Sequence, residues 1–216
     1  MIQCPSCGRL AEPSLQCSNC SGPLPANVDL FTALGLPRKL TIAPEQLEAT
    51  YHRLGRELHP DRFAAARPEV RRASLTATSL LTRAYRTLRD PISRANYWLE
   101  LHGRKARENG SRVPADVAEM VFDIHEELAE FAQSRNAVPA DASDLTERVN
   151  ERRMEIVNRL EALDRELAAT FCSLDQVQDA PPDESVAQLL SILSRRAYLR
   201  TLLRDIEKAL DTRPSA

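Results

Sequence analysis

The pattern of apolar and polar positions divides the chain into three blocks that predict different structures. Residues 1–26 are rich in Cys, Pro, Ser and Gly and have too few apolar positions for a hydrophobic core. Residues 27–104 carry apolar side chains at helical spacing, interrupted at glycine and proline. Residues 112–212 contain three longer amphipathic segments. We therefore expect an all-α chain that begins with a small knuckle.

Stop signals set the expected helix boundaries in the second block. A short apolar helix is expected at 28–34, where a glycine follows. The next helix begins at Pro44, because proline is favoured in a first turn, and it ends at Pro60, which lacks the N–H that a helix needs. A third helix ends before Pro91, and a fourth covers 92–102. The second and third helices would form a hairpin with residue 60 at its tip.

Breaks at 136–142 and 175–184 separate the three amphipathic segments of the third block. The middle segment has the clearest helical spacing, in a stripe of Leu145, Val149, Ile156, Leu160, Leu163, Leu167 and Phe171. Cys172 closes this stripe, and we expect it to be a small buried hydrophobe. Three amphipathic helices with short connections pack as an antiparallel bundle.

Composition narrows the classes of function. Charged residues make up 28% of the chain and hydrophobic residues 43%, which is typical of a folded protein. The net charge of -2 and the pI near 6.1 argue against a nucleic-acid partner. The sequence contains no apolar run long enough to span a membrane and no secretion signal, so we expect a cytoplasmic protein without a membrane partner.

Four cysteines form two C-x-x-C pairs in the first block: Cys4, Cys7, Cys17 and Cys20. Two residues between thiolates let one tight turn present both sulfurs to a single ion, and a glycine soon after each pair suits such a turn. Four thiolates complete a tetrahedral site with no open position, which predicts one structural zinc ion in a zinc-ribbon-like knuckle. A rubredoxin-like iron site would use the same ligands.

The predicted tip of the helical hairpin reads His59-Pro60-Asp61. An enzyme would use His59 as a general base oriented by Asp61. We disfavour this because two side chains that flank a rigid proline are poorly placed to bond each other, and no nucleophile motif lies nearby. We expect no catalytic residues in this chain.

A helical hairpin with this tip and a basic preceding helix resembles the J domain of DnaJ-family co-chaperones. In that family the tripeptide inserts at the ATPase domain of the chaperone, while the basic helix face docks on an acidic surface. The chaperone-binding residues that the resemblance implies are His59, Pro60, Asp61, His52, Arg53 and Arg56.

Further motifs resemble the HscB family of J-domain co-chaperones. These motifs are Leu30 to Pro37, His59 to Phe63, Thr87 to Pro91, Arg94-Ala95 and Leu101 to Gly103. Some HscB-type proteins also carry an N-terminal tetracysteine segment. The resemblance implies a zinc segment at 1–26, a J domain at 27–104 and a scaffold-binding three-helix bundle at 112–212. It also implies stimulation of a DnaK/HscA-class ATPase and delivery of an IscU-type iron-sulfur scaffold protein for cluster transfer.

The family binds its scaffold protein on the first and last bundle helices. Helical periodicity points to the same region, because Phe122 falls about 140° around its helix from the core stripe. Tyr198 likewise lies off the stripe of its helix. Exposed aromatics beside Asp123 and Glu126 would be suitable interface anchors, although packing against the J domain would explain the same pattern.

Two competing functions fit parts of the sequence. A J-domain protein with another client would keep the role of Asp61 but would not bind the scaffold. A zinc-ribbon nucleic-acid-binding or regulatory protein would use the cysteine segment as its functional module.

Overall fold

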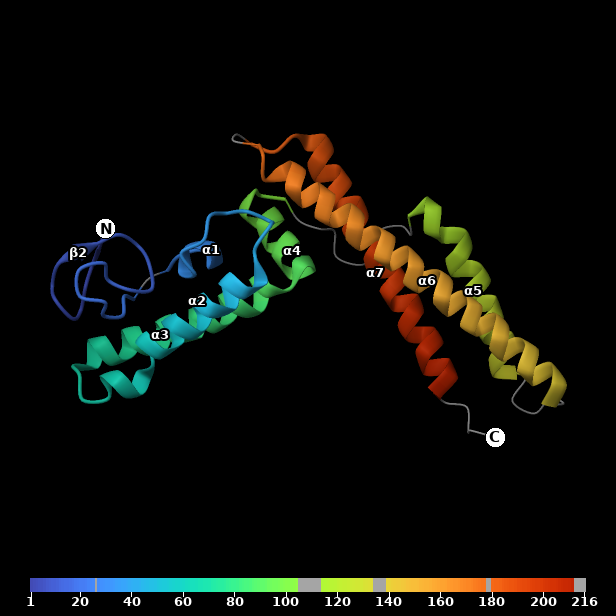
Figure 1. Cartoon of the computed structure of the whole chain (residues 1–216), viewed down its shortest axis with the longest axis horizontal. Helices are drawn as coiled ribbons and strands as arrows, with labels where there is room; N and C mark the ends of the chain where they lie inside the picture. Colours follow the sequence, from blue (N-terminus) through green and yellow to red (C-terminus); the bar gives the residue numbers. More distant parts are fainter. Residues whose placement is uncertain (26, 105–113, 134–138, 178–179, 212–216) are drawn as a thin grey trace. The chain divides into compact units, whose positions relative to one another are not determined.

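The computed structural model contains two compact units, Met1–Arg104 and Lys105–Ala216 (Figure 1). The structure describes residues 1–25, 27–104, 114–133, 139–177 and 180–211. Within these ranges the regular secondary structure is helical apart from a two-stranded sheet near the N-terminus, which confirms the expected all-α class with an N-terminal knuckle. Among the described helices, none combines the length and apolar character needed to cross a bilayer.

The N-terminal knuckle is built around its cysteines. Strand β1 (Ile2–Gln3) pairs antiparallel with β2 (Leu10–Ala11), and an isolated bridge joins Gln16 to Pro23. One buried hydrophobic cluster of this segment consists of Cys4, Ala11, Cys17 and Leu24, with Ile2 and Val28 packed against it, and Leu15 is buried as well. Two of the four thiols therefore belong to the small core itself.

Helix α1 (Leu30–Ala33) is shorter than the predicted 28–34 because Asp29 caps it. The Asp29 carboxylate accepts the backbone N–H groups of Phe31 and Thr32, both at 3.0 Å, and pairs with Arg38 at 2.9 Å. Burial acts to raise the pKa of Asp29, but the hydrogen bonds from Thr32 and Arg38 outweigh it and leave the pKa lowered. This capping bond fixes where the first helix starts.

Helices α2 (Pro44–Glu57) and α3 (Pro68–Arg89) form the predicted hairpin, and α4 (Pro91–Leu101) follows. Leu47 and Leu54 of α2 are buried, and so is Leu58, which caps the end of this helix. Tyr51 stacks on Tyr85 of α3 with ring centroids 4.2 Å apart. From α3 and α4 the core receives Ala77, Leu81, Ala84, Leu88, Ala95, Trp98 and Leu99.

The second unit packs α5 (Ala115–Gln133), α6 (Pro139–Leu174) and α7 (Asp183–Asp211) against one another as three helices. The whole predicted stripe of α6 from Leu145 to Phe171 is buried. The predicted break at 136–142 is too long, because α6 already begins at Pro139, a residue suited to a first helical turn.

Cys172 is exposed, so the expectation that it is a buried hydrophobe is wrong. Its neighbours Phe171 and Leu174 are both buried. Positions 171 and 174 are three apart and share the core side of the helix, which turns Cys172 away from it.

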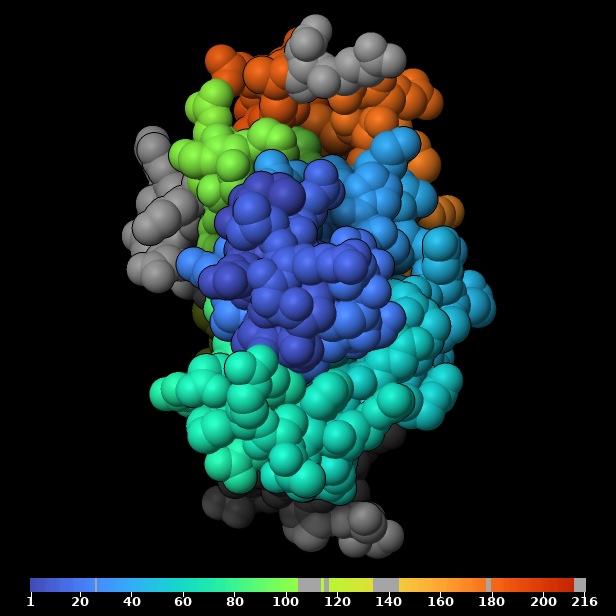
Figure 2. Space-filling view, turned by 90° about the vertical axis from the view of Figure 1, so that its left-hand side faces the viewer, coloured from blue at the N-terminus to red at the C-terminus, as the bar shows by residue number. Residues whose placement is uncertain are grey.

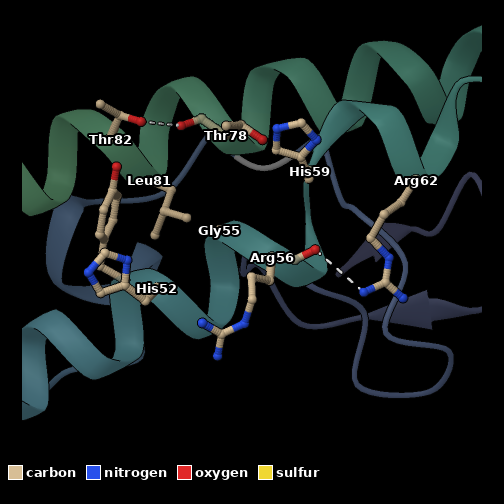
Figure 3. A pocket seen from close by; sticks show the side chains of 9 residues that line it. His52, Gly55, Arg56, His59, Arg62, Thr78, Leu81 and Thr82 are labelled. Carbon is tan, nitrogen blue, oxygen red and sulfur yellow. Dashed lines mark hydrogen bonds between the residues drawn. The ribbon is translucent and has the colours of Figure 1, made fainter.

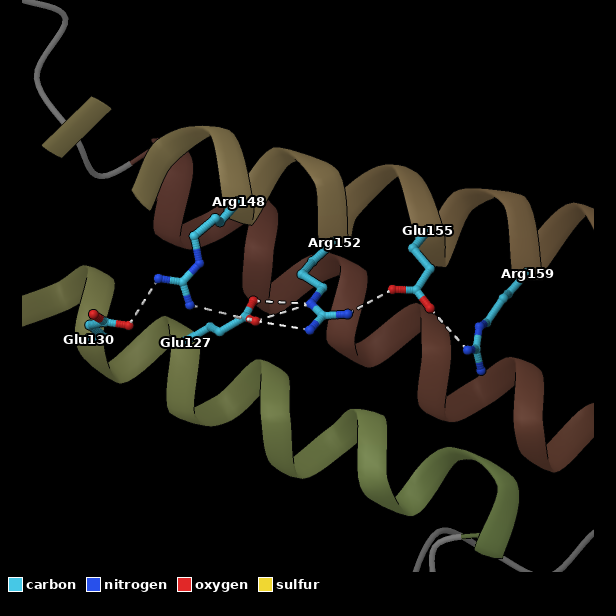
Figure 4. Close-up of polar contacts among 6 residues, drawn as sticks. All are labelled: Glu127, Glu130, Arg148, Arg152, Glu155 and Arg159. Carbon is cyan, nitrogen blue, oxygen red and sulfur yellow. Dashed lines mark hydrogen bonds and ion pairs between the residues drawn. The ribbon is translucent and has the colours of Figure 1, made fainter. Parts of the chain in front are cut away.

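Ion pairs connect the bundle helices across their surface (Figure 4). Arg152 of α6 donates from Nε and Nη2 to Glu127 of α5, at 3.1 Å each, and also pairs with Glu155 at 3.0 Å. The Glu127 side chain is only 16% exposed. Hydrogen bonding to Glu127 and Glu155 raises the pKa of Arg152. Two guanidinium nitrogens bond one carboxylate, which is the arrangement in which a surface ion pair contributes most to stability.

We predict that Asp29→Ala destabilises the first unit by about 1 kcal/mol, since removal of a side-chain N-cap leaves backbone donors unsatisfied. Trp98 is the only tryptophan of the chain and is buried in this unit, so its fluorescence during urea unfolding reports the change. Glu100→Ala removes an exposed carboxylate of the same unit and serves as the control. Equal unfolding midpoints for the two variants would contradict the capping role.

Candidate functional site

The loop that carries His59, Pro60 and Asp61 begins at a backbone carbonyl that is fixed from α3. Ser74 is fully buried, and its hydroxyl donates to the Leu58 carbonyl at 2.7 Å. The Thr78 hydroxyl donates to the same carbonyl at 3.2 Å. The last carbonyls of a helix lack partners within it, so these two hydroxyls anchor the end of α2 just before the tripeptide.

Pro60 and Asp61 of the tripeptide begin a short 3-10 turn, η1 (Pro60–Phe63). His59 precedes the turn, and its Nδ1 accepts the backbone N–H of Asp61 at 3.3 Å. Arg62 donates its backbone N–H to the His59 carbonyl at 3.0 Å and its guanidinium to the Arg56 carbonyl at 3.4 Å. The Asp61 side chain is 90% exposed. The backbone of the tip is therefore held while the Asp61 carboxylate is exposed to solvent.

One premise used against an enzyme is wrong, because His59 Nδ1 lies 3.5 Å from a carboxylate oxygen of Asp61. The 3-10 turn brings the two side chains together. However, Nδ1 accepts the Asp61 N–H and so has no proton to donate to the carboxylate in that arrangement, unless the ring gives up the backbone bond. This contact is not that of a general base oriented through its N–H.

A groove of about 510 Å³ between α2 and α3 gathers part of the predicted basic face (Figure 3). It is lined by Tyr51, His52, Gly55, Arg56, His59, Arg62, Thr78, Leu81 and Thr82. Arg53 is exposed outside this lining and pairs with Glu57 at 3.1 Å. The structure thus brings His52, Arg56 and His59 together and adds Arg62, which we missed despite its place directly after the tripeptide.

Charge is segregated between the two units. The first unit has fourteen Arg and Lys against nine Asp and Glu, while the second has fifteen against twenty-two. Net charges of +5 and -7 therefore underlie the total of -2. The small net charge of the whole chain therefore does not exclude an anionic partner for the positively charged first unit.

The four predicted metal ligands lie together in the knuckle. Their sulfurs are all within 4.8 Å of one another; Cys4 and Cys20 are 3.6 Å apart, and Cys7 and Cys17 are 3.9 Å apart. Sulfurs at the corners of a tetrahedron around an ion at about 2.3 Å would be about 3.8 Å apart. The four cysteines are therefore close enough to hold one metal ion, and their spacing fits a tetrahedral thiolate site.

The two turns of the knuckle differ in where they need a left-handed residue. In the first turn Gly8 has φ of +75° and donates to the Cys4 carbonyl at 2.8 Å, as expected. In the second turn Ser21 takes the corresponding place, with φ of +56°. Gly22 is needed for another reason, because a Cβ there would lie 2.5 Å from the hydroxyl of Ser6.

Thiol acidity differs among the four cysteines. A backbone hydrogen bond from Arg9 lowers the pKa of Cys7 to about 6, and one from Asn19 lowers the pKa of Cys17. Burial raises the pKa of Cys20. Backbone donors of this kind stabilise thiolates, the form of cysteine that binds metal.

The predicted scaffold-binding residues are placed on two helices. On α5, Phe122 is 70% exposed, Glu126 is exposed and Asp123 is half-buried. On α7, Tyr198 is half-buried, so the expectation of an exposed aromatic holds for Phe122 alone. These residues remain predictions for the binding of a partner.

Several known proteins similar to this chain are named HscB co-chaperones. The chain is 34% identical over 164 residues to the co-chaperone protein HscB homolog of Burkholderia cenocepacia, covering 75% of this chain and 86% of the relative. It is 37% identical over 91 residues to the homolog of Chromobacterium violaceum, but this match covers 42% of the chain and only about half, 52%, of that relative. No family model matches the chain.

A solved structure supports the fold. The crystal structure of human co-chaperone protein HscB superposes with a TM-score of 0.58 at 20% identity, over 99% of this chain and all of that one. At this identity the likeness concerns the fold alone.

Proposed function

This chain belongs to the HscB family of co-chaperones, and we propose that it activates the ATPase of a DnaK/HscA-class chaperone and delivers an IscU-type scaffold protein to it. In this proposal residues 27–104 act as the J domain and residues 112–212 bind the scaffold. The observation that carries the proposal is the anchored, solvent-facing turn at His59, Pro60 and Asp61. The protein itself would hydrolyse no ATP, and we place it in the cytoplasm.

The tip of the hairpin provides the contact with the chaperone. The exposed Asp61 carboxylate can accept paired hydrogen bonds from an arginine of the partner. Pro60 and the bonds to the Leu58 carbonyl fix the backbone beforehand, so little conformational entropy is lost on docking. The groove with Arg56 and Arg62 adds positive charge beside the tip, which would favour an acidic surface on the chaperone.

The acidic bundle provides the second contact. Phe122 is exposed on α5 beside Asp123 and Glu126. Binding surfaces often have an aromatic residue at their centre and polar residues at their rim. When one chain holds both partners, the effective concentration of scaffold at the chaperone rises. Hydrolysis in the chaperone would then close it on the scaffold and favour cluster transfer.

For the metal centre we propose zinc. Four sulfur donors at tetrahedral spacing leave no position for water or substrate, so the ion would be structural. Cys4, Cys7, Cys17 and Cys20 would hold it as thiolates.

The positive charge of the first unit is compatible with one competing function, the binding of nucleic acid. A zinc-ribbon nucleic-acid-binding protein would bind DNA or RNA with steep salt dependence. The activity of the tip distinguishes it from a co-chaperone, because Asp61 would have no role in binding a polyanion.

We predict that Asp61→Asn lowers stimulation of the chaperone ATPase by at least about tenfold, because a hydrogen bond between charged groups contributes about 1.5–3 kcal/mol. Steady-state ATP hydrolysis with and without scaffold measures the effect. Glu69→Gln, at an exposed carboxylate at the start of α3, is the control and should stimulate normally. Full stimulation by Asp61→Asn would rule out the proposed docking mode.

We predict that Phe122→Ala weakens scaffold binding by about thirtyfold, the loss of about 2 kcal/mol expected for a central aromatic anchor. Titration calorimetry with the purified scaffold measures the affinity. Met154→Ala removes another exposed apolar side chain of the same unit, 53% exposed, and should bind as the wild type does. If both variants bind equally well, the anchor lies elsewhere.

We predict one zinc ion per chain, lost in Cys17→Ser and retained in Cys172→Ser, because only the former removes a knuckle sulfur. Elemental analysis of the purified protein gives the metal content and also distinguishes zinc from iron. Full zinc content in Cys17→Ser would show that the ion is bound by other residues.

A further inference from the structure

The cysteine knuckle contacts both ends of the loop that carries the tripeptide. Gln16 donates from Nε2 to the Glu57 carboxylate at 2.9 Å, and Glu57 is the last residue of α2. Arg67, the N-cap of α3, donates from its guanidinium to the Pro5 carbonyl. Figure 2 shows the knuckle in dark blue lying directly against the teal residues of this loop. Residues 58–67, with the tripeptide among them, run between these two contacts.

The two contacts come from different halves of the metal site. Pro5 lies in the first turn, directly after Cys4, and Gln16 directly precedes Cys17 in the second. Gln16 is also bridged to Pro23, and its side chain donates to the Ser21 carbonyl at 3.2 Å. The four sulfurs lie within 4.8 Å of one another, so an ion held by all four would fix the two turns relative to each other.

Apart from the sulfurs, the halves are joined by a hydrogen bond from the exposed Arg9 guanidinium to Asn19 Oδ1 at 2.6 Å and by a small core. The core cluster of the knuckle consists of four buried residues, two of which are the thiols Cys4 and Cys17. Segments of this size with four thiolates are generally unfolded without their metal. With the ion bound, the knuckle would present the Pro5 carbonyl and the Gln16 amide at a fixed separation.

The negative charge of Glu57 strengthens its hydrogen bond with Gln16. The hydrogen bond from Gln16 is the main reason that the pKa of Glu57 is lowered. Burial acts to raise this pKa, and the nearby Arg53 lowers it further. The Glu57 carboxylate thus bonds the knuckle and a residue of the predicted basic face at once.

We propose that the metal-loaded knuckle braces the loop 58–67 through Gln16 and Arg67, so that metal binding and the geometry of the tripeptide turn are thermodynamically coupled. The effect of this coupling on chaperone activation rests on the proposed function. The coupling between the metal site and the loop does not depend on it. Coupling between two sites is reciprocal. Loss of the brace must therefore weaken metal binding, and loss of metal must loosen the loop.

The test uses the full-length double variant Gln16→Met/Arg67→Met, in which both donors are replaced by apolar chains. Zinc affinity, measured by competition with a chromophoric chelator, should fall at least about tenfold, because each of the two lost hydrogen bonds involves a charged group. Gln46→Met/Arg71→Met changes an exposed glutamine of α2 and an exposed arginine of α3 and is the matched control. It should bind zinc as the wild type does.

Hydrogen exchange reports the loop itself. The backbone N–H groups of Arg62 and Ala64 bond within the turn, and their exchange should accelerate both in the double variant and in wild type stripped of zinc. Trp98 fluorescence verifies that the helices remain folded. Unchanged zinc affinity, or exchange that does not respond to zinc, would overturn the brace. Neither measurement needs the chaperone, so an absence of ATPase stimulation in wild type would refute the proposed function without touching this result.

Discussion

The packing of α2 against α3 is the constraint on which the exposed loop depends. Leu54 of α2, Leu58 at the C-terminal cap of this helix and Leu81 of α3 are buried in the first unit, and the stacked rings of Tyr51 and Tyr85 join the two helices. A helix that ends at a surface leaves carbonyl groups without partners. Here the hydroxyls of α3 and a guanidinium from the loop satisfy them. The tip can therefore expose a carboxylate without fraying the helix behind it.

The parts of the structure that sequence could predict are those set by local chemistry. Apolar spacing predicts the buried face of α2. Proline predicts the start of α2 at Pro44 and a helix end shortly before Pro60. The paired cysteines predict the metal centre because both turns need only a few neighbouring residues. The tripeptide with its basic preceding helix predicted a J domain, and the further motifs between Leu30 and Gly103 predicted the HscB family.

Contacts between residues distant in sequence could not be predicted from the sequence. Ser74 reads as an ordinary helical serine, yet it bonds a carbonyl sixteen residues earlier. Gln16 and Glu57 are forty-one residues apart, and neither has a local signal for the other. Cys172 was misplaced because a stripe was extended by one residue, and a helix turns by about 100° over that step.

Opposite charges on the two units fit a chain that serves two partners. Salt screens charges over about 10 Å, so a partner responds to the surface that it meets and not to the net charge of the chain. Within the positive unit, the knuckle differs from the hairpin in what holds it together. A hydrophobic core supports the hairpin unconditionally, whereas a knuckle with two thiols in its core needs its ion. A contact made by such a segment is conditional on the metal, and in this chain that conditional contact lies at both ends of the loop 58–67.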